Sequence, residues 1–309
     1  MSIAGSMLLE ILAAALLAAV GGELFLKGIV GAAASMKVPK LLIATTFAAF
    51  ATSSPELTVS TVAALAGKPE IGLGDALGSN VLNIALILGL ALMFGPMQVE
   101  RSDLGRDFAF ALTVPLLTLW LARDGNITRP EGAVLLLILA FWIGLLIRAG
   151  RSAFQQGIHV EAQLWRPLLY AMTGLLALVI AGRLFVNGAS AIAEVLGVDT
   201  YLAGALVVAA GTSLPELVTV LLSRIRGHDD VGIGTLLGSN LFNGLAIVGL
   251  AASIHPITAR PMEVGTTIGI GVLSLMLLIP GPDSKIGPRR GVMLLAAYAI
   301  FVAGSIGSG

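Results

Sequence analysis

The chain contains no cysteine and little charge among its 309 residues. The lack of cysteine excludes disulfide bonds, thiolate metal sites and thiol nucleophiles. Charged residues make up 12% of the sequence, whereas a soluble protein carries roughly 25%. This amount of charge could not cover the surface of a globular protein in water. The net charge is zero, so there is no excess of basic residues to indicate nucleic-acid binding, and we expect no nucleic-acid partner.

Hydrophobic residues make up 57% of the chain, and the mean hydropathy is +0.96. Apolar runs recur at lengths of about 20 residues, which is the length that a helix needs to cross a bilayer. The runs are continuous and do not alternate with polar residues, which favours helices over a membrane barrel. The sequence therefore predicts an all-α polytopic membrane protein with ten transmembrane helices. The predicted spans are 7–31, 40–66, 70–94, 105–122, 130–148, 166–190, 199–223, 230–253, 264–280 and 289–307.

The distribution of Lys and Arg among the loops predicts the orientation of the chain. One alternate set of loops carries twelve of these residues and the other set carries four. Basic loops stay on the cytoplasmic side, so we expect the 150–165 connector in the cytoplasm and both termini outside. The N-terminal apolar run has no charged segment before it and no clear cleavage site, which favours a first membrane helix over a removed signal. We expect an integral protein of a bacterial or archaeal cell (inner) membrane, in contact with the lipid bilayer and functional as a monomer.

An internal repeat relates the two halves of the chain. Residues 51–90 and 211–250 align without gaps at an offset of 160 positions, and 16 of the 40 aligned positions are identical. The shared positions include Thr-Ser-x-Pro-Glu-Leu at 52–57 and 212–217, and Gly-Ser-Asn followed by a further Asn at 78–83 and 238–243. Leucine and glycine would match partly by composition, but these polar residues would not. A duplicated unit is therefore predicted.

Five predicted spans separate each residue from its partner, and an odd number inverts the second copy relative to the first. Inverted repeats are typical of secondary transporters, which bind their substrate near the membrane midplane on interrupted helices. The predicted domains are a five-helix repeat over 1–149, a short connector over 150–165, and an inverted five-helix repeat over 166–309. Glu56 lies 16 residues into its span, or roughly 24 Å from the inner end, so it falls near the midplane.

Two acids at this depth indicate a cation site. A membrane-buried carboxylate is costly unless it is paired, protonated or turned towards a polar cavity, and a divalent cation would neutralise Glu56 and Glu216 together. Calcium takes six to eight oxygen ligands. Further oxygens are available from nearby side chains, namely the amides of Asn83 and Asn243 and the hydroxyls of Thr52, Ser53, Thr212 and Ser213.

Two prolines and one further acid complete the pattern. Pro55 and Pro215 each interrupt a helix and free a backbone carbonyl, and irregular backbone at this depth is tolerated where it lines a cavity. Asp75 aligns with Thr235 and lies nearer the outer end of its span than Asn83, which predicts a charge at the rim of the site.

The segments ATSSPEL…GLGDALGSNVLN and GTSLPELVT…GIGTLLGSNLFN resemble the two α-repeats of the sodium/calcium exchanger family, within the calcium/cation antiporter superfamily. The resemblance implies a Ca²⁺ site on Glu56 and Glu216, with backbone carbonyls from Thr52 and Thr212. It also implies that Asn83 and Asn243 complete the centre, although the family often carries Asp in place of Asn243. The implied ligands of flanking Na⁺ sites are Ala49, Ser53, Ser79, Ala209, Ser213 and Ser239. Family members move the first and sixth helices across the other eight.

The sequence thus predicts a secondary active antiporter that exchanges Ca²⁺ for Na⁺ by alternating access. It has no cofactor beyond the transported ions. A proton-coupled cation antiporter is the alternative, with protonated glutamates replacing bound Na⁺. A cation channel would use the same carboxylates as a filter. An enzyme is not indicated, because the chain shows no nucleophile–base pair or HExxH motif.

Overall fold

The structure is a computed structural model that describes residues 3–36, 39–99, 101–155, 164–195, 209–279 and 284–307. Nearly all of these residues are helical. The helical segments of the first half are α1 (Ile3–Met36), α2 (Lys40–Ile43), η1 (Ala44–Ala48), α3 (Ala49–Thr52), α4 (Ser54–Leu65), α5 (Pro69–Val81), η2 (Leu82–Leu88), α6 (Gly89–Met93), α7 (Arg101–Leu121), η3 (Ala122–Asp124) and α8 (Arg129–Gln155). Those of the second half are α9 (Trp165–Val195), α11 (Ala209–Thr212), α12 (Leu214–Ile225), α13 (Asp229–Phe242), η5 (Asn243–Ile247), α14 (Val248–Ile254), α15 (Pro261–Met276) and α16 (Pro288–Gly307).

Each of the ten predicted spans coincides with helix, although the seventh is described only from Ala209 onwards. The fifth predicted span ends at residue 148, whereas α8 continues to Gln155, so the helix takes up the first part of the predicted connector. Within the described ranges, five helices are long and apolar enough to cross a membrane: Leu12–Met36, Pro69–Met93, Arg129–Arg148, Trp165–Leu184 and Asp229–Ile254.

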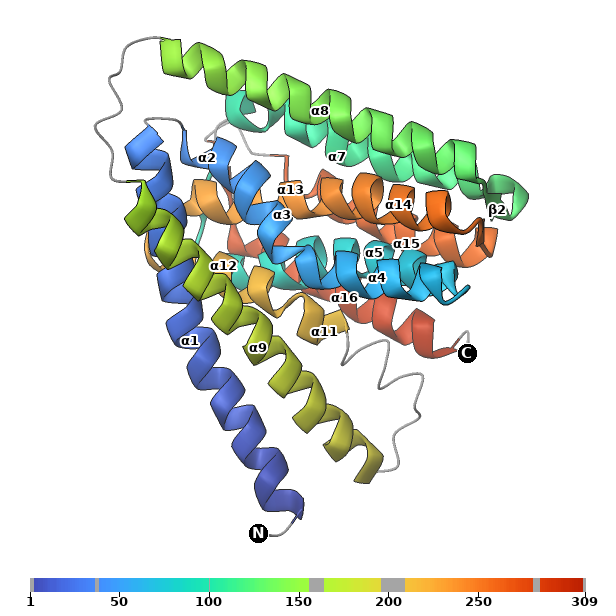
Figure 1. Ribbon diagram of the computed structural model, residues 1–309, viewed down its shortest axis with the longest axis horizontal. Helices are drawn as coiled ribbons and strands as arrows, with labels where there is room; N and C mark the ends of the chain where they lie inside the picture. Colours follow the sequence, from blue (N-terminus) through green and yellow to red (C-terminus); the bar gives the residue numbers. More distant parts are fainter. Residues whose placement is uncertain are drawn as a thin grey trace.

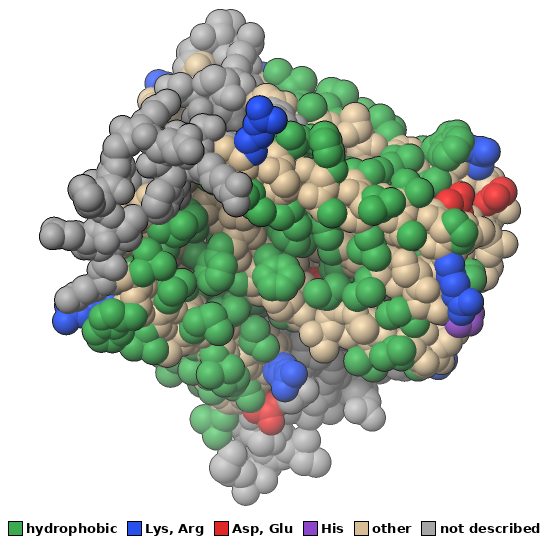
Figure 2. Space-filling model, turned by 45° about the horizontal axis from the view of Figure 1, so that its top comes forward, with side chains coloured by type: hydrophobic (Ala, Val, Ile, Leu, Met, Phe, Trp, Pro, Cys, Tyr) green, Lys and Arg blue, Asp and Glu red, His purple; other side chains and the backbone are tan. Residues whose placement is uncertain are grey.

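The outer surface of the protein is apolar. Large hydrophobic side chains are among its most exposed groups; Leu65 is 72% exposed and Leu137 is 68% exposed. Figure 2 shows one face on which hydrophobic side chains predominate and charged ones are few. A surface of this kind suits lipid, while the polar residues of the repeat are buried. The protein is thus an all-helical membrane protein with a polar interior.

The helices form a central bundle that is crossed obliquely by two long helices, α1 and α9, lying side by side (Figure 1). Glycine lets these two backbones approach closely, because a Cβ atom at Gly28 would stand 2.4 Å from the Ala171 nitrogen. The buried side chains of α1 and α9 pack with α2, η1, Ala51 of α3 and Val231 of α13 in a second apolar cluster beside the larger core of the bundle. The oblique pair therefore packs mainly against itself and contacts the bundle through α12 as well.

The repeat is visible in the backbone as well as in the sequence. The helix breaks at Ser53, between α3 and α4, and again at Ser213, between α11 and α12, with nearly equal torsion angles (φ −83°, ψ 7° and φ −85°, ψ 10°). Pro55 and Pro215 follow each break within the first turn of the next helix, where a missing N–H is tolerated. The two halves thus share one local structure at the same offset.

Two short antiparallel strand pairs connect the halves at the ends of the bundle. Strand β1 (Met97–Gln98) pairs with β4 (Lys285–Ile286). Strand β2 (Asn126–Ile127) pairs with β3 (Ile257–Thr258). Each pair takes one strand from each half, and it joins two loops that the alternating spans place on the same side of the membrane.

Candidate ion-binding site

The two glutamates of the repeat lie buried in the centre of the bundle. Glu56 is in the first turn of α4 and Glu216 in the first turn of α12, and each is 1% exposed. The break before each helix, with a proline in its first turn, fixes the position of the carboxylate. Among the described residues, the salt bridges present do not involve either glutamate.

Hydroxyl groups connect each glutamate to the opposite half of the chain. Ser53 donates a hydrogen bond to Glu216 Oε1 at 3.1 Å, and Ser213 donates one to Glu56 Oε1 at 3.1 Å. This exchange follows the pseudo-twofold relation of the repeats. The carboxylates are therefore brought to one layer by α3–α4 and α11–α12 together, as the sequence predicts.

Serine residues of α5 and α13 extend each network. Ser239 donates to Glu216 Oε1 at 3.1 Å and lies 3.4 Å from Thr52 Oγ1. The same Ser239 hydroxyl reaches the Ala49 carbonyl at 3.5 Å. On the other side, the Ser213 hydroxyl contacts Ser79 Oγ at 3.3 Å. Polar groups from four helical segments thus surround the two acids.

The asparagines form a bridge between α5 and α13 that the sequence analysis missed. Asn80 Nδ2 donates to the Asn240 carbonyl, and Asn240 Nδ2 donates to the Asn80 carbonyl, both at 3.3 Å. Asn83 Nδ2 then donates to Asn240 Oδ1 at 3.0 Å. The signal was present in the sequence, because Asn80 and Asn240 are an identical pair of the repeat, but nothing in the spacing indicates that they face each other.

A π-helical turn follows each Gly-Ser-Asn segment. η2 begins one residue before Asn83, and η5 begins at Asn243. Such turns are rare and occur often at functional sites, because they displace side chains from regular helical positions. Hydrophobic periodicity does not reveal them.

Four buried oxygens of this centre have no hydrogen-bond partner. They are Glu56 Oε2, Glu216 Oε2, Asn83 Oδ1 and Asn243 Oδ1. Buried acceptors are nearly always satisfied in native proteins, so this cluster of exceptions requires a physical reason. Carboxylate and amide oxygens are the ligands that hard cations such as Ca²⁺ prefer. The unpartnered oxygens of this centre are thus of the kind that hard cations prefer.

Two of the twelve predicted site residues are less fully described. Ala209 is the first residue of α11, and the structure describes its backbone but not its side chain. Thr212 is 9% exposed and makes an interaction within the protein. The remaining ten are all buried to 3% exposure or less.

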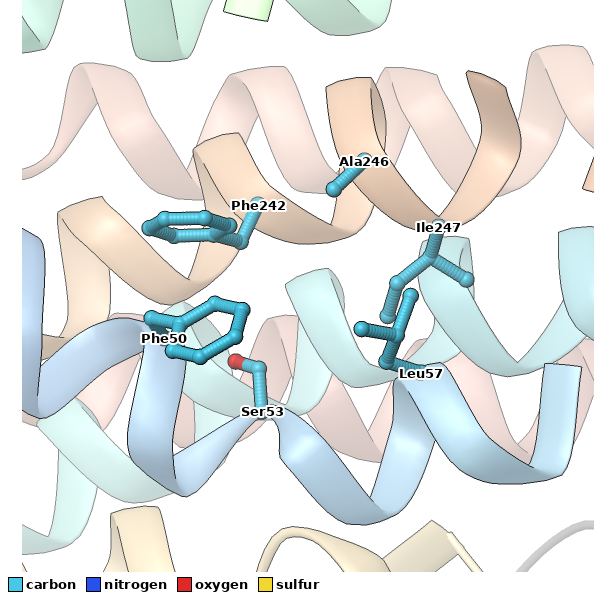
Figure 3. A pocket seen from close by; sticks show the side chains of 6 residues that line it. All are labelled: Phe50, Ser53, Leu57, Phe242, Ala246 and Ile247. Carbon is cyan, nitrogen blue, oxygen red and sulfur yellow. The ribbon is translucent and has the colours of Figure 1, made fainter. Parts of the chain in front are cut away.

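A small pocket adjoins the centre at Ser53. Its walls are apolar except for this serine, and they are formed by Phe50, Leu57, Phe242, Ala246 and Ile247 (Figure 3). The rings of Phe50 and Phe242 lie 5.5 Å apart between their centroids. Because Ser53 also donates to Glu216, this apolar pocket lies next to the polar centre.

The chain is similar in sequence to known proteins over most of its length. A model of the sodium/calcium exchanger protein family matches residues 6–148 and 167–307. The chain is 31% identical to the putative antiporter CaxA of Alkalimonas amylolytica, over 89% of this chain and 90% of that protein. It is 30% identical to the inner membrane protein YrbG of Escherichia coli, over 86% of each.

The fold is likewise similar to a solved one. A structure of the sodium-calcium exchanger NCX_Mj, soaked with 10 mM Na⁺ and 10 mM Sr²⁺, superposes with a TM-score of 0.85 at 26% identity, covering 97% of this chain and 99% of that one. With both repeats matched and nearly the whole length superposed, the chain belongs to the sodium/calcium exchanger family, a family of ion transporters and not of enzymes.

Proposed function

We propose that this protein is a Na⁺/Ca²⁺ antiporter in which both ions compete for Glu56 and Glu216. The observation that carries the proposal is the group of four buried, unpartnered oxygens contributed by both repeats. Two carboxylates supply the charge that a divalent cation requires, and two amide oxygens add neutral ligands. Structures of NCX_Mj have been soaked with Na⁺ and Sr²⁺, and Sr²⁺ resembles Ca²⁺ in charge and ligand preference.

The remaining predicted ligands fit the same proposal. Ser53, Ser79, Ser213 and Ser239 take part in the hydrogen-bond networks around the two carboxylates. Their hydroxyl oxygens would serve Na⁺, together with the carbonyls of the flanking residues. These further predicted contributors are Ala49, Thr52, Ala209 and Thr212.

Exchange follows from the cost of an empty site. Without a cation, two carboxylates would face each other in a low-dielectric interior, where their charges repel and are poorly solvated. The empty carrier should therefore cross poorly, which forces one ion to leave only as another enters. The alternation itself would be a slide of α1 and α9 over the bundle, because these two helices pack mainly against each other and cross the bundle obliquely.

The orientation and the boundaries of the repeats are part of the proposal. Both termini would lie outside, and the connector between α8 and α9 would lie in the cytoplasm. The repeats would extend over 1–149 and 166–309, the protein would act as a monomer, and it would reside in the cell membrane of its source.

Ion flux into proteoliposomes tests the proposal. We expect radiolabelled Ca²⁺ to accumulate when Na⁺ is inside and absent outside, and not when choline replaces Na⁺. Equal uptake with and without the Na⁺ gradient would contradict sodium coupling. Uptake driven by a proton gradient in sodium-free medium would favour the proton-coupled alternative.

A further inference from the structure

The oblique pair of helices, α1 and α9, covers one repeat more than the other. Val218 and Leu222 of α12 are partly buried against the apolar cluster of α1, where a Cβ atom at Gly22 of α1 would collide with both side chains. The equivalent residues of α4 are Thr58 and Val62, and both are exposed, Val62 by 61%. One face of α12 is therefore covered by α1, while the same face of α4 is open.

The offset of 160 positions relates α1 to α9 as well as α4 to α12. The sequence Gly-x-Leu-Phe occurs at 22–25 and again at 182–185. Because the repeats are inverted copies of each other, exchanging their roles would place α9 on α4 as α1 now lies on α12. The present and the exchanged arrangement are then the two end states of the proposed slide.

An ion pair joins α1 to α12 in the present arrangement. Arg226, the C-cap residue of α12, donates to Glu23 Oε2 from Nη2 at 2.9 Å and from Nε at 3.2 Å. Glu23 follows Gly22 directly in the chain, so the ion pair lies beside the close contact of the two helices. The guanidinium group thus fixes the height of α1 along α12.

The exchanged arrangement cannot form this ion pair. In that arrangement Arg183 of α9 takes the place of Glu23, and Ala66 at the end of α4 takes the place of Arg226. Alanine offers the arginine no charge and no acceptor side chain. The ion pair therefore belongs to one end state only, whereas the serine bonds to the two glutamates are the same in both directions.

We propose that the Glu23–Arg226 ion pair biases the alternation of α1 and α9 towards the state in which α12 is covered. A contact that exists in only one of two states shifts the equilibrium by its own free energy. In the proposed orientation α12 ends on the cytoplasmic side, so the favoured state is closed to the cytoplasm. This inference rests on the proposed slide and adds an unequal distribution of its two end states.

The distance between two spin labels measures this distribution without requiring transport. The chain has no cysteine, so Leu16→Cys on α1 and Leu137→Cys on α8 supply the only thiols, at side chains that are 71% and 68% exposed. Pulsed electron paramagnetic resonance of the purified protein, in choline chloride without Na⁺ or Ca²⁺, then reports one distance for each end state. We expect Glu23→Gln and Arg226→Gln each to raise the minor population by about twofold to fivefold, the effect of one exposed ion pair.

A charge swap and a matched control separate the ion pair from other effects. Glu23→Arg combined with Arg226→Glu restores the attraction, and we expect it to return the populations to those of the wild-type chain. Lys27→Gln removes another charge of α1, whose ammonium group lies over the Tyr170 ring of α9 at 4.9 Å. Because α1 and α9 pack mainly against each other, this contact persists in both states, and the populations should not change.

Unchanged populations in both single variants would overturn the inference, as would a single distance in every variant. A lower unfolding temperature without a change in the populations would assign the ion pair a structural role only and overturn it as well. So would a change that the charge swap does not reverse. Failure of the proposed function has a different signature, which is the absence of Na⁺-driven Ca²⁺ flux in the wild-type chain.

Discussion

Asn83 and Asn243 occupy equivalent positions in the two repeats, yet their surroundings differ. Asn83 donates its amide to Asn240 Oδ1, which fixes its own Oδ1 in the centre. The mirrored acceptor, Asn80 Oδ1, is buried without a partner, and so is Asn243 Oδ1. By contrast, Glu56 and Glu216 have matching partners across the interface. The serine bonds that cross between the repeats are thus the same in both directions, whereas the amide contact between Asn83 and Asn240 next to them occurs in one direction only.

The largest expected effect comes from the symmetrical pair. Glu56→Gln and Glu216→Gln should each reduce Ca²⁺ transport to background, because each removes one of the two charges that a divalent ion requires. The serine donors can still bond to the glutamine oxygen, so both proteins should fold. Flux assays on proteoliposomes, with size-exclusion profiles as the folding control, check this expectation.

The Glu→Gln pair also tests whether the repeats contribute equally. Retained transport in both single variants would remove these residues as essential ligands. Loss in only one of them would show that the two halves are not equivalent at the carboxylates. Glu70→Gln, at an exposed acid, should transport normally.

An intermediate effect is expected where the halves differ. Asn243→Asp should tighten Ca²⁺ binding by about tenfold, since a charged ligand replaces a neutral one. Asn83→Asp should weaken it, because the carboxylate loses the amide donor and faces Asn240 Oδ1 at the 3.0 Å contact. Ca²⁺ titrations of thermal stability measure both variants. Equal effects at the two positions would show that the asymmetry has no functional role.

The smallest effect concerns the asparagine bridge. Asn240→Ala removes two hydrogen bonds, one to the Asn80 carbonyl and one from Asn83, whereas Asn80→Ala removes one. A net hydrogen bond contributes about 1 kcal/mol, so Asn240→Ala should destabilise the protein by about 1 kcal/mol more than Asn80→Ala. Thermal unfolding in detergent measures the difference. The opposite order would contradict the hydrogen-bond assignment.

Much of the architecture could be predicted because it depends on composition and repetition. Apolar runs of bilayer length identify the helices, and the offset of 160 positions identifies the repeat. The breaks at Ser53 and Ser213 follow from prolines whose effect is local. These features need no knowledge of how the helices pack.

Other features depend on three-dimensional contacts that a linear pattern does not contain. The hydrogen bond from Ser53 to Glu216 depends on how α3 and α12 are placed relative to each other. Spacing gives the height of Asp75 along its span but not what surrounds it, such as the burial of its Oδ2 atom without a hydrogen-bond partner. The extension of α8 to Gln155 also escaped the hydropathy pattern, since that pattern marks the apolar length of a helix and not its end.

The strand pairs at the two ends of the bundle have a consequence for how the two halves depend on each other. Strand β1 finds its partner only in the second half, and strand β2 does likewise. A single half would leave both strands with open hydrogen-bonding edges. Each half therefore completes its strand pairs only with the other half. Because both halves belong to one polypeptide, the two strand pairs form within a single chain.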